Sequence, residues 1–445
     1  MKADVVKRNS GPVPRYTSYP TAPQFSPLIG PAEYAAWLQK LAPETRLSLY
    51  LHVPFCRELC WYCACNTRAV RRYAPVASYL ESLIHEMGIV SRALTGRPSV
   101  GHIHWGGGSP SMLSPFDVRR VARALVDNFD IRPDAEQAVE VDPRELSDGT
   151  IEALVASGVT RVSVGVQDFE EAVQAAINRH QSFEDTKRTI EAFRSRGVNS
   201  VNIDLVYGLP HQTVESADRT IASVLTLRPD RLAVFGYAHV PAKAKHQRLI
   251  DGPSLPGPEE RIRQLGRITE RVVAAGYKAI GIDHFALPAD KLATSRLRRN
   301  FQGYTTDDSD ALIGMGASSI GQLPQGYVQN ATAVGEYSRR IEQGKLATAR
   351  GYHMTDDDRL RGYVIERLMC DFAFSRAEVI ERFGAAAAPV IEEAAALVAN
   401  DQDGFVEATP DGFRCTPDGR TFVRTIAAKF DAYWGQGSAT HALAV

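Results

Sequence analysis

Short apolar runs rich in β-branched residues alternate with amphipathic stretches from about residue 47 to residue 237. The apolar runs predict six strands, at Leu47–Val53, Val100–Trp105, Ala138–Val141, Arg161–Val166, Val201–Val206 and Arg231–Tyr237. Apolar positions at helical spacing predict intervening helices at Val76–Ala93, Pro115–Asn128, Thr150–Ala156, Phe183–Arg196 and Val214–Leu227. Because strands that alternate with helices form a mainly parallel sheet, we expect an α/β protein.

Polar or glycine-rich residues follow each predicted strand. The segments are a cysteine-rich loop after Phe55, Gly106-Gly-Gly-Ser-Pro110, Glu140-Val-Asp-Pro143, Gly165-Val-Gln167, Asn202-Ile-Asp204 with Tyr207-Gly-Leu-Pro210, and Gly236-Tyr-Ala-His239. The strands of a parallel barrel all end on one face, where their loops build a site. An open doubly wound sheet instead binds ligands at one switch point. Since all six ends are polar, we favour a partial parallel (β/α)6 barrel.

Four of the six cysteines, Cys56, Cys60, Cys63 and Cys65, lie in one short segment. The first three have the spacing Cys-x3-Cys-x2-Cys, and three thiolates can hold a cubane iron–sulfur cluster with one iron lacking a protein ligand. A structural zinc site is the alternative, but zinc favours paired cysteine hooks far apart in the sequence. The spacing therefore favours a 4Fe–4S cluster with an open iron.

Two other segments allow more than one interpretation. Gly106–Gly108 is consistent with a tight strand-to-helix turn, or with the close approach of backbone groups to a ligand. Glu140 and Asp142 are consistent with an acid–base pair, or with a single carboxylate directed at a ribose or ammonium group. Gly314-Met-Gly316 lacks the third glycine of a dinucleotide loop, which argues against a Rossmann site.

Chain length and charge narrow the choice of function. The 445 residues predict one large domain and a smaller one. With 51 basic and 52 acidic residues, the chain has no electrostatic footprint for nucleic acid or an anionic membrane, and we expect neither partner. No signal peptide or membrane-spanning run is evident, so we expect a cytoplasmic protein whose clustered thiols stay reduced.

The cysteine segment resembles a known family. Cys56-Arg-Glu-Leu-Cys60-Trp-Tyr-Cys63 resembles the cluster loop of radical S-adenosylmethionine (SAM) enzymes, and Gly106-Gly-Gly-Ser109 resembles their methionine-binding stretch. Three more segments resemble the oxygen-independent coproporphyrinogen III oxidases, namely Arg15-Tyr-Thr-Ser-Tyr-Pro-Thr21, Cys63-Ala-Cys65-Asn and Arg299-Asn-Phe-Gln-Gly-Tyr-Thr-Thr306. The resemblance runs from about Pro14 through nearly the whole chain.

The resemblance implies a radical SAM oxidoreductase of porphyrin and haem biosynthesis. A reduced cluster would cleave SAM to methionine and a 5'-deoxyadenosyl radical, which would abstract hydrogen from a propionate of coproporphyrinogen III. Loss of carbon dioxide and one electron would leave a vinyl group, and two conversions would give protoporphyrinogen IX. The protein would position the propionate and exclude water. The expected partners are this substrate and an electron donor such as flavodoxin or ferredoxin, and the chain is expected to be a monomer.

The resemblance also implies roles for individual residues. The implied cluster ligands are Cys56, Cys60 and Cys63, and the implied contacts of the cluster-bound SAM are Tyr50, Tyr62, Gly107, Glu140 and Ile320. A second SAM site is implied at Gly108, Ser109, Gln167, Arg179, Asp204 and Ala238. Whether a second SAM is a co-substrate or occupies the place of the porphyrinogen stays open.

Cys65, His52 and Glu140 are the candidate catalytic residues. The family pattern contains Cys65 without using it as a cluster ligand, and a buried thiol is the alternative. His52 shares a strand face with Tyr50 and is equally consistent with a hydrogen-bonded barrel histidine. Because guanidinium groups pair bidentately with carboxylates, the candidates for binding the substrate are Arg15, Arg298 and Arg299.

The rest of the chain suggests three parts. Residues 1–30 are expected to form an extended arm that closes as a lid, and residues 31–350 the catalytic barrel. Residues 351–445 are expected to form a small, mainly helical, winged-helix-like cover, with helices at Leu360–Phe372 and Ala385–Ala399 and strands at Gly404–Ala408 and Gly412–Thr416. Since this part is not strongly basic, it is interpreted as a cover and not as a DNA-binding domain.

Two classes of function compete. The first is the porphyrinogen-decarboxylating enzyme, and the second is a related haem chaperone that retains the barrel and cluster but delivers haem unchanged. The chaperone group typically lacks Cys65 and the Arg15-Tyr-Thr-Ser-Tyr-Pro arm, so the sequence favours the enzyme. A ferredoxin-like electron carrier does not fit the chain length or the missing fourth cysteine.

Overall fold

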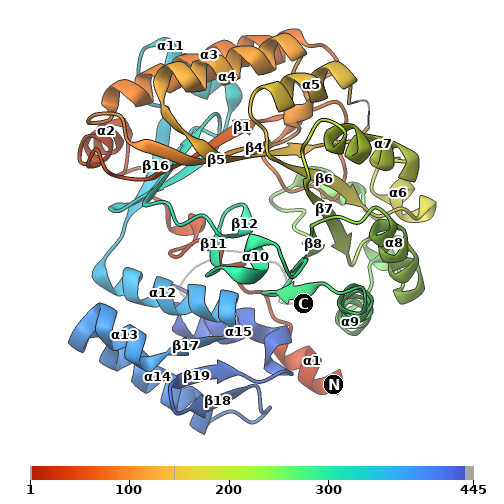
Figure 1. Cartoon of the computed structure of the whole chain (residues 1–445). Coiled ribbons are helices and arrows are strands. Elements are labelled where there is room, and N and C mark those ends of the chain that lie inside the picture. The colour runs from red at the N-terminus through yellow and green to blue at the C-terminus, as the bar shows by residue number, and fades with distance from the viewer. Residues whose placement is uncertain (1–2, 145, 436–445) are drawn as a thin grey trace.

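A curved sheet of twelve strands forms the centre of the computed structural model, which describes residues 3–144 and 146–435 (Figure 1). Across the sheet, the strands are β16 (Thr348–His353), β15 (Gly326–Asn330), β14 (Ile320–Leu323), β13 (Ala311–Met315), β1 (Leu47–Val53), β4 (Ser99–Gly107), β5 (Asp130–Val141), β6 (Arg161–Gln167), β7 (Ser200–Tyr207), β8 (Arg231–Gly236), β10 (His284–Ala286) and β9 (Lys278–Ile280).

The predicted α/β fold with six parallel strands is confirmed. Strands β1, β4, β5, β6, β7 and β8 are neighbours in chain order, and each pair is parallel. The two outer strands, β16 and β9, lie at opposite ends of the strand order, so the described sheet forms a partial barrel. The carboxyl ends of the six strands therefore lie along one rim, as a single site requires.

The sequence analysis did not predict the strands that extend the sheet beyond these six. Strand β13 pairs in parallel with β1, and β14, β15 and β16 continue from it as antiparallel strands. The Gly314–Ile320 segment, considered above as a nucleotide loop, lies in the β13–β14 hairpin. A Cβ atom at Gly314 would lie 2.7 Å from the Ile320 carbonyl oxygen, so glycine lets the two strands approach.

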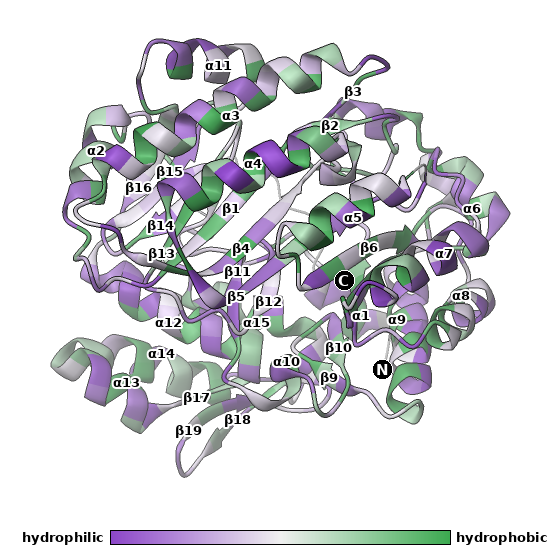
Figure 2. Cartoon of the chain, turned by 45° about the horizontal axis from the view of Figure 1, so that its top comes forward, coloured by the Kyte–Doolittle hydropathy of each residue, from purple (hydrophilic) through white to green (hydrophobic). Residues whose placement is uncertain are grey.

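Helices cover the outer side of the sheet (Figure 1). They are α2 (Pro31–Gln39), α3 (Ala74–Ala93), α4 (Pro115–Asn128), α5 (Asp148–Ala156), α6 (Glu171–Ala176), α7 (Phe183–Arg194), α8 (Val214–Thr226), α9 (Pro258–Ala274) and α11 (Val334–Glu342). The short helix α10 (Lys291–Thr294) lies instead on the open side (Figure 1). Hydrophobic and hydrophilic residues alternate along α3, α4 and α5 (Figure 2), as expected for helices with one buried face. Side chains of Ser114, Ser147, Ser182 and Thr213 cap α4, α5, α7 and α8, which satisfies backbone N–H groups at their first turns.

A buried carboxyl group ties α3 to the sheet extension. Glu86, which is 1% exposed, accepts hydrogen bonds of 2.6 Å each from the Gly316 N–H, Asn330 Nδ2 and Tyr337 Oη. Burial nevertheless raises the pKa of Glu86 to about 7, because desolvation outweighs these three donors. Glu86 is therefore a structural group that joins α3, β13, β15 and α11.

The stability of the protein is expected to fall with rising pH because of Glu86. The Glu86 carboxyl group binds its proton more tightly in the folded protein than in the unfolded chain, where its pKa is near 4.5. The stabilisation that comes from this difference is therefore fully present below about pH 4.5. It is lost as the pH rises through about 7 and amounts to about 3 kcal/mol. In urea unfolding, the free energy of unfolding of the parent should fall relative to that of Glu86→Gln by up to that amount as the pH rises from about 5 to about 8. Parallel pH curves for the two proteins would contradict this role.

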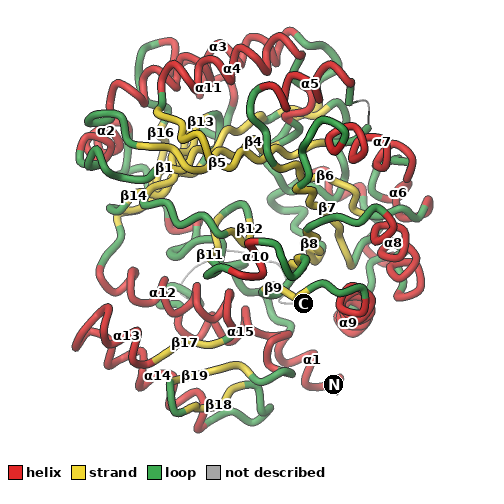
Figure 3. Tube along the Cα trace, viewed as in Figure 1, coloured by secondary structure: helices red, strands yellow, loops and turns green. Residues whose placement is uncertain are grey.

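The C-terminal part has its own apolar core and lies on the open side of the sheet (Figure 3). Its helices are α12 (Asp356–Asp371), α13 (Arg376–Phe383), α14 (Ala388–Ala399) and α15 (Val423–Ala427). They pack with an antiparallel sheet of β17 (Ala373–Ser375), β19 (Gly412–Cys415) and β18 (Val406–Thr409). Two small two-stranded sheets complete the described fold, β2 (Phe55–Cys56) with β3 (Arg68–Ala69) and β11 (Arg298–Asn300) with β12 (Gly303–Thr305).

The prediction that the N-terminal arm is extended was wrong for its first described residues, which form helix α1 (Ala3–Asn9). A helix of seven residues is too short to show a clear apolar period. The arm packs against the C-terminal part, where Thr425 Oγ1 donates to the Asn9 carbonyl at 3.0 Å and Tyr16 Oη donates to Asp431 at 3.0 Å. The two ends of the described chain therefore lie together.

Among the helices of the described residues, none combines the length and apolar composition needed to cross a membrane.

Candidate active site

The cysteine loop follows β1 at the rim of the barrel and is held from several directions. Strand β2, which contains Cys56, pairs with β3 and so brings the two ends of the loop together. Asn178 Nδ2 donates to the Leu59 carbonyl at 3.0 Å, and Gln247 Nε2 donates to the Tyr62 carbonyl at 2.8 Å. His246 Nε2 lies 2.6 Å from the Cys63 carbonyl. These three clamping residues were not predicted from the sequence, because they lie outside the strand ends and belong to no motif.

A cavity of about 530 Å³ opens beside this loop. Most of the residues predicted for the site line it, and they come from the loop, the ends of β4 to β8, the connection between α6 and α7, and the N-terminal arm. They are Cys56, Cys60, Tyr62, Cys63, Cys65, Gly107, Gly108, Glu140, Gln167, Arg179, Asp204, Ala238 and Arg15. The rim of the sheet thus brings residues together that are separated by more than two hundred positions in the chain.

Two guanidinium groups lie beside the thiol of Cys60. Arg179 Nη1 lies 3.6 Å and Arg144 Nη2 lies 3.8 Å from Cys60 Sγ. Asp142 pairs with both, at 3.1 Å from Arg179 and 2.7 Å from Arg144. Burial opposes ionisation of Asp142, but the two arginines outweigh it and hold its pKa below the usual range. Arg144 was not predicted, although it directly follows the polar end of β5.

The other loop thiols differ in their surroundings. Burial raises the pKa of Cys56 to about 12, although Thr67 Oγ1 lies 3.3 Å from its sulfur. A hydrogen bond from the side chain of Cys65 lowers the pKa of Cys63. No group of three or more His, Cys, Asp or Glu side chains among the described residues is arranged around a single-ion position. The three predicted ligands instead line one cavity, which suits a larger, multi-atom group held by thiolates.

The glycine segment after β4 lies in contact with the cysteine loop. The Gly108 N–H donates to the Val53 carbonyl at 2.8 Å. A Cβ atom at Gly108 would lie 2.4 Å from Thr67 Oγ1 and 2.5 Å from the Phe55 carbonyl oxygen. Gly107, with a φ of 117°, would place a Cβ atom 2.8 Å from the His52 ring. Glycine therefore lets this segment pack closely against the cysteine loop and His52, while the close approach to a ligand stays a prediction.

Glu140 and Asp142 have different partners and do not form a pair. Glu140 accepts hydrogen bonds from the Gly107 N–H at 3.1 Å and interacts with His104 Nε2 at 3.0 Å. Burial opposes its ionisation, but these contacts outweigh it, and the pKa of Glu140 lies below its usual range. Farther along the rim, Asp204 accepts from Ser163 at 2.8 Å, while burial raises its pKa to about 6.

Comparison with known proteins agrees with this geometry. Residues 50–224 match the radical SAM superfamily, and residues 354–422 match the HemN C-terminal domain. The oxygen-independent coproporphyrinogen III oxidase of Bradyrhizobium diazoefficiens is 47% identical over 450 residues, which cover 100% of both chains. That of Pseudomonas aeruginosa is 41% identical and covers 97% of this chain and 95% of the relative. The chain belongs to the oxygen-independent coproporphyrinogen III oxidase family.

The solved structures support the same family. Coproporphyrinogen III oxidase (HemN) from Escherichia coli, described as a radical SAM enzyme, has a TM-score of 0.90 and 38% identity, and the match covers 97% of this chain and 99% of that one. As a member of the coproporphyrinogen oxidase family, the chain is a radical SAM oxidoreductase that uses a 4Fe–4S cluster and SAM. The resemblance inferred from the sequence is confirmed.

Two other predicted residues, Tyr50 and His52, are not among the described residues that line the cavity beside the cysteine loop. Tyr50 Oη and His52 Nδ1 are 2.9 Å apart, and His52 Nε2 lies 2.9 Å from the Asn66 carbonyl. Burial lowers the pKa of His52, so the ring is neutral, with Nε2–H donating to Asn66 and Nδ1 accepting from Tyr50. This arrangement supports the structural alternative for His52, which holds the end of the cysteine loop.

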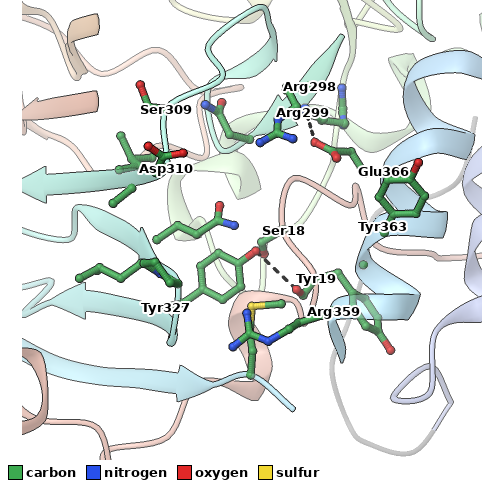
Figure 4. A pocket seen from close by; sticks show the side chains of 18 of the residues that line it. Ser18, Tyr19, Arg298, Arg299, Ser309, Asp310, Tyr327, Arg359, Tyr363 and Glu366 are labelled. Atoms are coloured by element: carbon green, nitrogen blue, oxygen red, sulfur yellow. Dashed lines mark hydrogen bonds between the residues drawn. The ribbon is translucent and has the colours of Figure 1, made fainter. Parts of the chain in front are cut away.

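Four more predicted residues lie elsewhere. Ser109 Oγ is 2.6 Å from Ser111 Oγ, and Ile320 is part of β14. Arg298 and Arg299 line a second cavity of about 530 Å³, between the sheet extension, the arm and α12 (Figure 4). Within the described residues, neither arginine lines the cavity beside the cysteine loop. The roles assigned to these residues remain predictions.

Proposed function

We propose that this chain converts two propionate side chains of coproporphyrinogen III to vinyl groups without oxygen, and so forms protoporphyrinogen IX. The observation that carries the proposal is the composition of one cavity. The three ligand thiols line it together with Cys65 and Arg15. These last two residues belong to the segments that the haem chaperones typically lack, which favours the enzyme over the chaperone.

The loop residues would hold the cluster through Cys56, Cys60 and Cys63, and the fourth iron would be left for SAM. Bound there, the cluster supplies the electron that cleaves SAM and starts the radical chemistry. Arg144 and Arg179 lie against the Cys60 sulfur and hold it in place. His52 and Glu140 stabilise the loop and the Gly107 backbone, so that the rim is rigid before ligands bind.

The remaining rim residues offer a polar binding surface. Tyr62, Gly107 and Glu140, with Tyr50 and Ile320, are proposed contacts of the cluster-bound SAM. Gly108, Ser109, Gln167, Arg179, Asp204 and Ala238 are proposed for a second molecule. The two terminal nitrogens of Arg179 already donate to Asp142, Gly165 and Cys60, which supports a positioning role for this residue. Cys65 faces the cavity and is the proposed catalytic thiol.

The proposal is tested by anaerobic reconstitution with iron and sulfide, followed by incubation with coproporphyrinogen III, SAM and a one-electron reductant. The expected result is deoxyadenosine together with a porphyrinogen that carries two new vinyl groups, identified by chromatography and mass spectrometry. Omission of SAM serves as the control. Tight haem binding without any vinyl product would support the chaperone and contradict the proposal.

Several wider features follow from this proposal. We place the reaction in the cytoplasm, with electrons from a flavodoxin- or ferredoxin-like donor and with the chain acting as a monomer. We divide the chain into an arm (1–30), which closes as a lid, a catalytic barrel (31–350) and a cover (351–445). A direct contact supports the lid, since Arg15 Nη2 donates to the Gly236 carbonyl at the rim at 2.7 Å.

A further inference from the structure

A small cavity of about 70 Å³ lies where the arm, the barrel and the C-terminal part meet. Five arginines line it, and Asp283 is the one acidic residue among its described lining residues. The arginines come from four separate segments, namely Arg15 in the arm, Arg261 in α9, Arg299 in β11, and Arg420 and Arg424 in the C-terminal part. We call this cavity the arginine socket.

Two of the socket arginines, Arg261 and Arg299, have buried donor atoms that no described protein group accepts. Asp283 already accepts from His284 Nδ1 at 2.7 Å. Arg261 Nε and Arg299 Nε and Nη1 are buried and have no hydrogen-bond partner in the structure. Burial lowers the pKa of both Arg261 and Arg15, and the charges of Arg299 and Arg261 lower that of Arg15 further. Because a guanidinium group stays charged in a protein, such an arrangement is completed by an anion.

Other donors in the socket are occupied in ways that fix the geometry. Arg261 Nη2 donates to the Tyr237 carbonyl at 2.8 Å, and Arg15 Nη2 donates to the Gly236 carbonyl at 2.7 Å. Arg299 stacks on Tyr304, with its guanidinium carbon 4.5 Å from the ring centre. The guanidinium planes are thereby held in position, and planar forks held in this way match a planar carboxylate.

The size and position of the socket restrict the anion. A water molecule occupies about 30 Å³ of liquid, so about 70 Å³ accommodates a carboxylate with adjoining methylene and excludes a pyrrole macrocycle. Arg15, Gly236 and Tyr237 line both the socket and the large cavity beside the cysteine loop. A ligand in the large cavity can therefore extend a carboxylate arm into the socket.

We infer that the arginine socket binds the carboxylate of a propionate that is not being converted, and so anchors the porphyrinogen while another propionate lies beside the cluster. The inference rests on the proposed function for the identity of the ligand. The carboxylate of a SAM methionine has the same chemistry, and the test below separates the two sources.

Arg261 is the best residue for the test, because its Nε has no partner and it lies at the start of α9. Coproporphyrin III, the fluorescent oxidised form of the substrate, should bind Arg261→Gln and Arg15→Gln about tenfold more weakly than the parent. SAM affinity, measured by calorimetry on the reconstituted protein, should not change. Arg267→Gln is the matched control, since Arg267 also lies on α9 but pairs with Asp218, and it should bind like the parent.

Thermal unfolding distinguishes binding from a structural role. In the ligand-free protein, removing one buried guanidinium group from a cavity lined by five arginines should leave the melting temperature of Arg261→Gln equal to or above that of the parent. Unchanged coproporphyrin affinity in both variants would overturn the inference, and so would a loss of SAM affinity with unchanged porphyrin affinity. A parent protein that binds coproporphyrin through these arginines but forms no vinyl product would contradict the proposed function alone.

Discussion

Replacing Cys60 with alanine is expected to abolish both the iron–sulfur cluster and the vinyl product. The loop offers three ligand cysteines, and two thiolates cannot hold a cubane against hydrolysis and loss of iron. Cys60 is also the thiol that contacts Arg144 and Arg179, and both arginines keep Asp142 as a partner when it is replaced. Iron and sulfide content after anaerobic reconstitution, together with product analysis, measures the effect.

Cys65→Ala is the variant to compare with Cys60→Ala, because Cys65 is not a predicted cluster ligand. The Cys65 backbone N–H donates to Cys63 Sγ at 3.4 Å, and this contact survives the substitution. We therefore expect Cys65→Ala to retain the iron and sulfide of the parent and to lose product formation. Loss of the cluster in this variant would show that the fourth cysteine is a ligand, and the open iron would have to be abandoned.

Gly108→Ala is expected to reduce cluster content and to lower product formation about a hundredfold, the effect of displacing reacting groups by about 1 Å. The added Cβ would lie 2.5 Å from the Phe55 carbonyl oxygen and 2.7 Å from the Phe55 nitrogen. These are backbone atoms, so relief requires the strand that carries Cys56 to move. We also expect a loss of about 1–3 kcal/mol of unfolding free energy from overpacking.

Gly101→Ala provides the control for Gly108→Ala. Gly101 lies in the same strand, β4, and a Cβ atom there would have nothing within 4 Å. Its effect on unfolding free energy should stay within about 0.5 kcal/mol, with the cluster content of the parent. Equal behaviour of the two alanine variants in urea unfolding and iron analysis would contradict the close approach of the glycine segment to the loop.

The parallel half of the fold was predictable because each strand is an apolar run with a distinct end. The prediction of Leu47–Val53 matches β1 to the residue, and Pro115–Asn128 matches α4. The sheet extension escaped prediction because its strands are short, and glycines such as Gly314 and Gly326 interrupt them. Long-range pairing in such strands is set by tertiary contacts, which sequence periodicity does not record.

The candidate site was predicted well where residues belong to motifs and poorly where they act through contacts. The cysteines and the polar strand ends meet in one cavity, as expected from parallel strands. His246 and Gln247, which hold the loop backbone, lie in a connection with no characteristic pattern. Arg261 could likewise not be recognised from the sequence, where it is one of several charged residues of an amphipathic helix. Only the folded chain brings it to Arg15 and Arg299.

The contact between the N-terminal arm and the C-terminal part limits when the arm can close during synthesis. Arg424 donates to the carbonyl groups of Val13 and Pro14, at 2.7 Å and 3.1 Å, so the arm is held by a segment that is translated much later. A nascent chain that does not yet contain Arg424 lacks this partner for the arm. The arm can therefore take its closed position only after the C-terminal part has been translated.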